Sequence, residues 1–328
     1  MPERELGRTG LRISSIGFGA WAIGGSWGDV SETDAKETLA AALDDGVTFV
    51  DTADVYGDGR SERIVRDVLA TRSGPRPVVA TKAGRRLNPH IADGYTYDAI
   101  EAFVDRSLSN LGVERIDLLQ LHCPPTEVYY DPELFHSLDR LVEKGKVSFF
   151  GVSVEKVEEA LKAIEYPNVA SVQIIYNIFR QRPSDLFFRE AKAKGVAVIA
   201  RVPLASGLLS GKMSKNTTFA ADDHRSFNRN GEAFDVGETF AGVPYDVALD
   251  AVDRLRPLVP EGASMAQFAL RWILMNDAVS VTIPGARTPA QATSNAATGA
   301  LAPLPPDTMS AIDEVYETLV KEHVHHRW

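Results

Sequence analysis

Only one cysteine, Cys123, occurs in the 328 residues of this sequence, which excludes an intrachain disulfide and fits a reducing compartment. Long apolar runs are lacking too, and none approaches the ~20 residues that a membrane-spanning helix needs. The polar start MPERELGRTG has no apolar stretch of the kind that marks a signal peptide. These features predict a cytoplasmic protein without a membrane partner.

Positive charge is in short supply. The chain has 35 lysines and arginines against 45 aspartates and glutamates, which gives a formal net charge of −10, and its isoelectric point is about 5.3. This acidic balance argues against nucleic acid or an anionic membrane surface as a partner. An anionic cofactor would therefore require a local group of basic residues.

Eight short apolar runs alternate with segments of helical period along the chain. Most of the runs show no alternation of polar and apolar residues, which is typical of strands buried on both faces of a parallel sheet. We predict strands over residues 16–19, 47–51, 78–82, 118–122, 147–152, 172–175, 196–201 and 279–283.

The segments between these runs have the spacing of amphipathic helices. Ile100, Val104 and Leu111 recur on one face of one segment, and Ser31 is placed to cap another. Eight strands alternating with helices predict an α/β fold, a (β/α)8 TIM barrel. Barrels of this kind run from ~200 to over 400 residues, and no linker composition interrupts the chain, so we expect one domain over residues 1–328.

Three segments depart from the plain repeat. Residues 3–15 predict an N-terminal β-hairpin that plugs the amino-terminal end of the barrel. Residues 205–245 are long, polar and rich in glycine, asparagine and aspartate, so we expect a large loop after the seventh strand. Two extra helices, over 245–258 and around 265–275, precede the eighth strand, and a last helix covers about 307–321.

Four polar residues stand at or just beyond the ends of predicted strands. Asp51, Lys82 and His122 close three consecutive strands, and Tyr56 follows Asp51 by five residues. Strand ends gather on one face of a parallel barrel, and that face carries the active site. Each residue alone could have a purely structural role. Asp51 could cap a turn, Tyr56 could be a surface aromatic residue, Lys82 a solvated charge and His122 a packed histidine. The combination favours a catalytic site.

This set of side chains suits the reduction of a carbonyl, which needs a hydride on carbon and a proton on oxygen. Side chains donate no hydride, so a nicotinamide must supply it, whereas a tyrosine can supply the proton. A free tyrosine, with a pKa of about 10, is a poor acid at neutral pH, and a neighbouring ammonium lowers that pKa. We assign Tyr56 as the general acid and Lys82 as the residue that lowers the pKa of Tyr56. Asp51 is assigned to hold the Lys82 ammonium in place, and His122 to orient the carbonyl.

The strings DTADVYGDGRSE, ATK and DLLQLH resemble the aldo-keto reductase superfamily. The likeness extends from ELGRTGLRISSIGFGAWAIGG to IPGARTPAQATSN, and the RVPL segment is closer to bacterial-type general reductases than to the mammalian aldose reductase branch. The resemblance implies an NADPH-dependent carbonyl reductase on a (β/α)8 barrel. Its catalytic tetrad falls on Asp51, Tyr56, Lys82 and His122, in agreement with the roles argued above.

The same resemblance implies cofactor positions. Ser153 and Gln173 are expected to bind the nicotinamide carboxamide, although Val154 stands where an asparagine is usual. Arg201 replaces an aromatic residue that stacks on the nicotinamide, and a planar guanidinium can stack in the same way. The full set implied for the cofactor is Ala20, Trp21, Asp51, Ser153, Gln173, Arg201, Pro203, Leu204, Ser206, Gly207, Leu209, Lys212, Gly285, Arg287, Gln291 and Asn295.

Two segments of that set are expected to hold phosphates. The stretch 204–212 resembles a pyrophosphate clamp, in which the backbone N–H groups of Ser206 and Gly207 and the ammonium of Lys212 suit anionic oxygens. Relatives often have a lysine after IP, whereas this chain reads IPGAR. Arg287 is the natural substitute, because a guanidinium binds phosphate bidentately. We therefore expect NADPH, with NADH as the weaker alternative.

Other interpretations remain open or fit less well. His323, His325 and His326 lack the carboxylates or cysteines of a metal site, so no metal is expected. A non-catalytic nucleotide-sensing subunit resembling potassium-channel β subunits is one alternative. An aldolase with a Schiff base on Lys82 is another, and a sugar or alcohol dehydrogenase that runs the reaction in reverse is a third. The substrate is expected to be a small carbonyl or alcohol compound.

Overall fold

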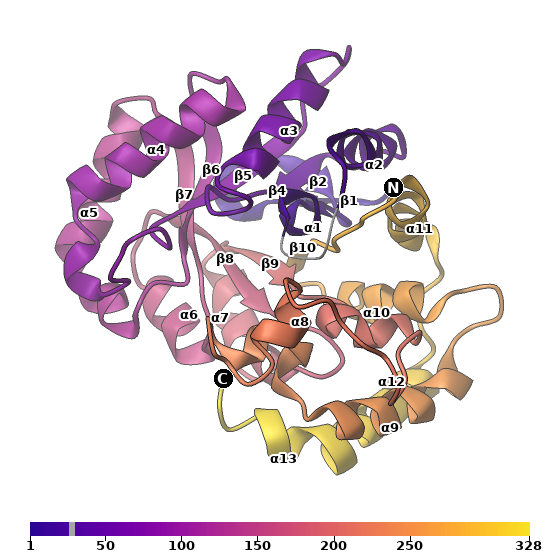
Figure 1. Ribbon diagram of the computed structural model, residues 1–328. Helices are drawn as coiled ribbons and strands as arrows, with labels where there is room; N and C mark the ends of the chain where they lie inside the picture. The colour runs from indigo at the N-terminus through magenta and orange to yellow at the C-terminus, as the bar shows by residue number, and fades with distance from the viewer. Residues whose placement is uncertain (26–29) are drawn as a thin grey trace.

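Eight parallel strands form the centre of the protein in the computed structural model, which describes residues 1–25 and 30–328 (Figure 1). The strands lie side by side in the order of the sequence, and each corresponds to one of the predicted runs. They are β3 (Phe18–Gly19), β4 (Phe49–Asp51), β5 (Val78–Ala83), β6 (Ile116–His122), β7 (Val147–Ser153), β8 (Val169–Ile175), β9 (Ala197–Arg201) and β10 (Val279–Thr282).

The first and last strands meet and close the barrel. Parallel bridges join Ile16 to Thr282 and Gly19 to Gly285, and Gly17 N donates a hydrogen bond to Thr282 O over 2.8 Å. The close approach requires glycine at position 19, because a Cβ there would lie 2.6 Å from the carbonyl oxygen of Ile283. Closure confirms the predicted (β/α)8 barrel.

The predicted hairpin plugs one end of this barrel. Strands β1 (Glu3–Glu5) and β2 (Arg12–Ser14) pair antiparallel. Leu6 and Ile13 are fully buried and pack with Phe49, Leu118 and Ile199 from the barrel strands. The hairpin therefore closes this end of the barrel with apolar side chains that the strands do not supply. Burial of these side chains stabilises the fold by about 25 cal/mol per Å² of apolar surface.

Helices alternate with the strands in the amino-terminal two thirds of the chain, and all but the one-turn α1 (Trp21–Gly24) lie outside them (Figure 1). Ser31 caps α2 by accepting a 3.1 Å hydrogen bond from Asp34 N, as predicted. Ile100, Val104 and Leu111 form the buried face of α4. These helices are α1 (Trp21–Gly24), α2 (Glu32–Asp44), α3 (Arg60–Ala70), α4 (Tyr97–Leu111), α5 (Pro132–Glu143), α6 (Val157–Ala163) and α7 (Phe187–Ala193).

The remaining helices include one that was not predicted. The two extra helices before β10 are present as α9 (Tyr245–Leu255) and α10 (Met265–Leu274). After β10, α11 (Pro289–Ala297) packs beside α2 (Figure 1). Its sequence, PAQATSNAA, has only alanine for an apolar face, so it carries a weak helical pattern. The last predicted helix is split into α12 (Pro306–Val315), a π-helical turn (Tyr316–Val320) and α13 (Lys321–Val324).

The predicted loop after β9 is more ordered than its composition suggested. It contains α8 (His224–Phe227) and 3-10 turns at Ala205–Ser210, Val236–Glu238 and Phe240–Gly242. Within the described part of the chain, no helix combines the length and the apolar character needed to cross a bilayer.

Candidate active site

The carboxyl ends of three neighbouring strands bring the predicted tetrad together. Asp51 ends β4, Lys82 lies near the end of β5 and His122 ends β6, while Tyr56 lies in the turn after β4. Lys82 Nζ lies 2.5 Å from Asp51 Oδ1 and 3.2 Å from the Tyr56 hydroxyl oxygen. The rings of Tyr56 and His122 stand edge to face, with centroids 5.9 Å apart.

A fully buried ion pair lies at the base of this group. Lys82 Nζ also donates to Thr52 O over 2.9 Å, and Asp51 Oδ2 accepts from Gln120 Nε2 at 3.1 Å and Gln173 Nε2 at 2.8 Å. Burial lowers the pKa of Lys82, but the Asp51 carboxylate and the Tyr56 hydroxyl outweigh burial, so this pKa lies above its ordinary value. Lys82 therefore carries a fixed positive charge beneath Tyr56.

Two opposing effects act on the pKa of Tyr56, and only one of them was considered from the sequence. Burial raises the pKa of Tyr56, and the nearby Lys82 ammonium lowers it by a smaller amount. The net direction is upward, because the desolvation of a buried phenolate outweighs one adjacent cation. Lys82 thus lowers the pKa of Tyr56, as expected, and burial raises it by more. Tyr56 is a neutral phenol at physiological pH.

His122 is held neutral by its surroundings. Burial lowers its pKa well below the ordinary value, and the cations of Arg85, Lys82 and Arg201 lower it further. Arg85 is in contact with it, since its Nη1 lies 3.5 Å from His122 Nε2. A neutral imidazole at this position can donate one hydrogen bond without bringing a charge.

A cavity of about 810 Å³ runs from the tetrad toward the end of β10. Most residues of the implied cofactor set line it, and the basic side chains of Lys212, Arg225 and Arg287 are distributed along it. Those that line it are Trp21, Asp51, Gln173, Arg201, Pro203, Leu204, Ser206, Gly207, Lys212, Gly285, Arg287, Gln291 and Asn295. An otherwise acidic protein thus concentrates cations where an elongated anion could lie.

Three residues of the set lie behind the wall instead of in it. Ala20, Ser153 and Leu209 are buried and are not among the residues that line the cavity. Ser153 Oγ donates to Gln173 Oε1 over 3.5 Å, so it supports Gln173. The backbone N–H of Gly207, expected to meet a phosphate, already donates to Leu204 O over 2.8 Å.

Arg201 is anchored beside the tetrad. Its Nη2 donates to Val154 O over 3.0 Å and to Glu155 Oε2 over 2.8 Å. Val154, which stands where the resemblance leads one to expect an asparagine, therefore contributes its carbonyl oxygen. Arg201 Nε is buried and has no hydrogen-bond partner among the residues that the structure describes. An unpaired buried donor is costly, so this atom suits an acceptor from a bound molecule.

Several residues of the site were missed in the sequence. Glu238, from the loop after β9, pairs with Arg85 across a 2.9 Å contact, and Arg225 and Phe219 of the same loop line the cavity. Arg85 follows Lys82 by three residues in AGRR, and a basic residue so close to a catalytic strand end was the one available signal. The loop residues gave none, because their positions depend on how a long irregular segment folds back.

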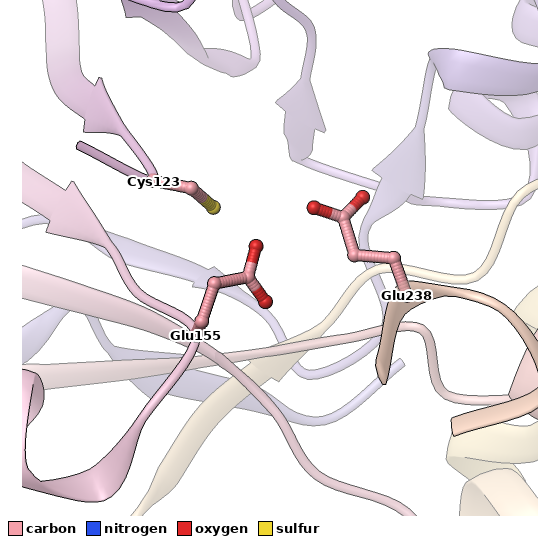
Figure 2. Close-up of side chains that lie close together, drawn as sticks. All are labelled: Cys123, Glu155 and Glu238. Atoms are coloured by element: carbon pink, nitrogen blue, oxygen red, sulfur yellow. The ribbon is translucent and has the colours of Figure 1, made fainter. Parts of the chain in front are cut away.

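Figure 2 shows Cys123, Glu155 and Glu238 directed toward one another, with ligand atoms within 4.8 Å. Burial raises the pKa of Glu155 to about 8, against the opposing effect of Arg201. Burial also acts to raise the pKa of Glu238, but Arg85 and Arg201 outweigh it and bring this pKa to about 2. A metal cation would here face two guanidinium groups, so the cluster is better suited to hold arginines.

Comparison with known proteins agrees with this geometry. The sequence profile of the Aldo/keto reductase family matches residues 15–317. The chain belongs to this family of oxidoreductases, which act on carbonyl or alcohol groups with a nicotinamide cofactor.

Individual relatives cover nearly the whole chain. Aldo-keto reductase YhdN of Bacillus subtilis (strain 168) is 32% identical over 297 residues, which span 89% of this chain and 86% of the relative. A probable voltage-gated potassium channel subunit beta of Oryza sativa subsp. japonica is 29% identical over 98% of each chain. The solved structure of the glycerol dehydrogenase AKR11B4 from Gluconobacter oxydans is similar with a TM-score of 0.76 at 30% identity, over 98% of this chain and 96% of that one.

Proposed function

We propose that this protein reduces an aldehyde or ketone to an alcohol, with NADPH as the reductant and Tyr56 as the proton donor. The observation that carries the proposal is the 3.2 Å contact between Lys82 Nζ and the Tyr56 hydroxyl at one end of the cavity. NADPH supplies the hydride when bound. The chain's own residues hold the carbonyl, orient it and deliver the proton.

Proton delivery rests on Tyr56 and the buried pair below it. Because burial keeps Tyr56 protonated, its hydroxyl can donate a hydrogen bond to the carbonyl oxygen. As the proton moves to that oxygen, negative charge develops on the phenol, and the ammonium of Lys82 stabilises it. Asp51 keeps the ammonium charged and in place. General acid catalysis of this kind contributes roughly 10²–10⁴-fold to a rate.

The role proposed for His122 is to orient the carbonyl. Its ring stands at 87° to that of Tyr56, so the two side chains approach a common oxygen from different directions. In the tautomer protonated at Nε2, a neutral imidazole donates a second hydrogen bond to this oxygen. Arg85 Nη1, which lies 3.5 Å from Nε2 and can only donate, has to move aside for this tautomer to act. The two donors would fix the carbonyl face that receives the hydride.

The residues of the cavity fit a dinucleotide cofactor. The Nε of Arg201, buried and without a hydrogen-bond partner among the described residues, can donate to a carboxamide or other acceptor near the nicotinamide. Lys212 and Arg225 suit the pyrophosphate oxygens. Arg287 is assigned to the 2′-phosphate, which distinguishes NADPH from NADH. This cofactor and the lone buried cysteine are consistent with a cytoplasmic location, which we also propose.

The test is NADPH consumption by the purified protein with a panel of aldehydes, ketones and open-chain sugars. We expect turnover of at least one carbonyl, and loss of that turnover in Tyr56→Phe with NADPH binding retained. Tight NADPH binding without turnover of any carbonyl or alcohol would count against the proposal. That result would favour a nucleotide-sensing role instead, which the likeness to a channel β subunit keeps as a rival.

The reverse reaction is the second candidate. The likeness to a glycerol dehydrogenase at 30% identity favours alcohol oxidation, in which the same tyrosine would accept the proton. Assays with NADP⁺ and a panel of polyols and sugars distinguish the two directions by their kcat/KM values. A faster reaction with polyols than with any carbonyl would assign the protein as a dehydrogenase.

A further inference from the structure

Residues 235–242, here called the strap, reach the active site from the loop after β9. The inner side of the strap carries Glu238, whose Oε1 lies 2.9 Å from Arg85 Nη1 and 3.8 Å from Arg201 Nη1. Arg85 in turn contacts His122, and Arg201 lines the cavity. One carboxylate therefore sets the position of two guanidinium groups that flank the proposed carbonyl site.

The strap also contacts one residue of the cavity wall, Ser206, through two hydrogen bonds. Ser206, which lines the cavity, donates its hydroxyl to Glu238 O over 3.1 Å and accepts from Phe240 N over 3.1 Å. The side chain of Ser206 thus bridges two strap residues. A shift of the strap would move Ser206 together with Glu238.

The outer side of the strap rests on Trp328, which is 3% exposed. Its Nε1 donates to Asp235 Oδ1 over 2.9 Å, and the guanidinium of Arg180 lies 4.1 Å from the indole centroid. The two glycines of the strap lie against the ring, since an added Cβ would be 2.9 Å from the indole at Gly237 and 2.5 Å at Gly242. The strap and the indole are therefore in direct contact along one face.

The backbone of the strap needs this support. Phe240 and Ala241 have φ values of 54° and 58°, in the left-handed region that residues other than glycine seldom adopt. Such conformations cost free energy and persist only where the surroundings hold them. Trp328 on one side and the Glu238 contacts on the other supply that restraint.

We propose that Trp328 is a positioning residue for the active site, which acts through Glu238. The inference rests on the proposed reductase function for its kinetic readout. Trp328 contacts Arg180 and the strap residues Asp235, Gly237 and Gly242. Trp328 holds the strap in place, and the strap positions Glu238. Glu238 in turn positions Arg85 beside His122, and Arg201 in the cavity.

A double-mutant cycle tests this order of action. Trp328→Ala and Glu238→Gln are each expected to lower kcat/KM for the best carbonyl by about tenfold. These values are measured at saturating NADPH, so that a shift of Ser206 in the cavity wall, which would weaken cofactor binding, does not enter the comparison. In the Glu238→Gln background, Trp328→Ala is then expected to have less than about a twofold further effect, because the carboxylate that it positions is gone. Effects that multiply would overturn the proposal, since Trp328 would then act independently of Glu238.

Two controls separate positioning from general damage. His326→Ala changes an exposed neighbour of Trp328 and is expected to leave kcat/KM unchanged. Trp328→Phe keeps a ring against Gly237 and Gly242, and it should recover most of the activity that alanine loses. If Trp328→Ala does not fold, the same cycle is run with Trp328→Leu, which also removes the ring, and Trp328→Phe remains the control.

Hydrogen exchange provides a readout that needs no turnover. Amides of 235–242 and 204–210 are expected to exchange faster in Trp328→Ala, whereas those of the barrel strands remain protected as in the parent protein. Unchanged exchange in the strap would contradict the positioning role. A parent protein that turns over no carbonyl would contradict the proposed function, and the exchange pattern would still decide the role of Trp328.

Discussion

The ammonium of Lys82 lies 3.2 Å from the hydroxyl oxygen of Tyr56 and forms a buried ion pair with Asp51. This contact joins the turn after β4 to the end of β5. Burial keeps the phenol protonated, while the cation beneath it favours the charge that forms when the proton leaves. Burial therefore keeps the proton on Tyr56 before the reaction, and Lys82 stabilises the phenolate charge that forms when the proton is transferred.

The buried pair makes a prediction about stability. Asp51→Asn leaves the Lys82 ammonium buried without its counter-charge, and removing one partner of a buried pair costs about 3–5 kcal/mol. Replacing both partners, as Asp51→Asn with Lys82→Met, should cost less, since no uncompensated charge remains. Denaturant unfolding measures the free energy of unfolding of the single and the double variant. A single variant as stable as the parent protein, or a double variant less stable than the single, would contradict this account.

A second buried carboxyl predicts a pH dependence of stability. Both side-chain oxygens of Asp54 are buried without a hydrogen-bond partner in the described part of the chain. Burial, then the negative charge of Glu62, raises the pKa of Asp54 to about 7. The folded state therefore binds one more proton than the unfolded state between about pH 4 and about pH 7, so the free energy of unfolding falls as pH rises through this window.

Asp54→Asn should remove that contribution, which is at most about 1.4 kcal/mol per pH unit. Urea unfolding at several values between about pH 5 and about pH 7 measures the slope. We expect a shallower decline for Asp54→Asn than for the parent protein. Equal slopes would show that Asp54 is ionised in the folded protein throughout this range.

The phosphate assignment makes a prediction about cofactor choice. Arg287→Ala should raise KM for NADPH by about tenfold or more, since a hydrogen bond to a charged group contributes about 1.5–3 kcal/mol. KM for NADH should change little, because NADH has no 2′-phosphate. Arg287→Lys keeps the charge and should fall between the two. An unchanged KM for NADPH in Arg287→Ala would remove Arg287 from this role.

Much of the framework could be predicted because it depends on local sequence. Strands buried on both faces appear as apolar runs, and residues such as Asp51 and His122 at their ends must meet on one face once the barrel closes. The hairpin was predictable for the same reason, as its buried Leu6 and Ile13 lie in a short pattern bounded by a glycine turn.

The rest depends on interactions between distant segments. Glu238 lies in a polar loop, and only the folded chain brings it to Arg85. The net pKa of Tyr56 depends on a balance between burial and the Lys82 charge that sequence cannot weigh. Helix α11 has no strong apolar face, so its docking against α2 decides its conformation more than its own pattern does.

The most direct test of the central claim is single-turnover hydride transfer in Tyr56→Phe, with NADPH bound before the carbonyl is added. Phenylalanine preserves the ring and removes the hydroxyl group, which carries the proton that Tyr56 would donate and contacts Lys82 Nζ. We predict a rate at least ~10²-fold below that of the parent protein, with NADPH affinity retained. A rate close to that of the parent protein would show that the proton reaches the carbonyl by another route.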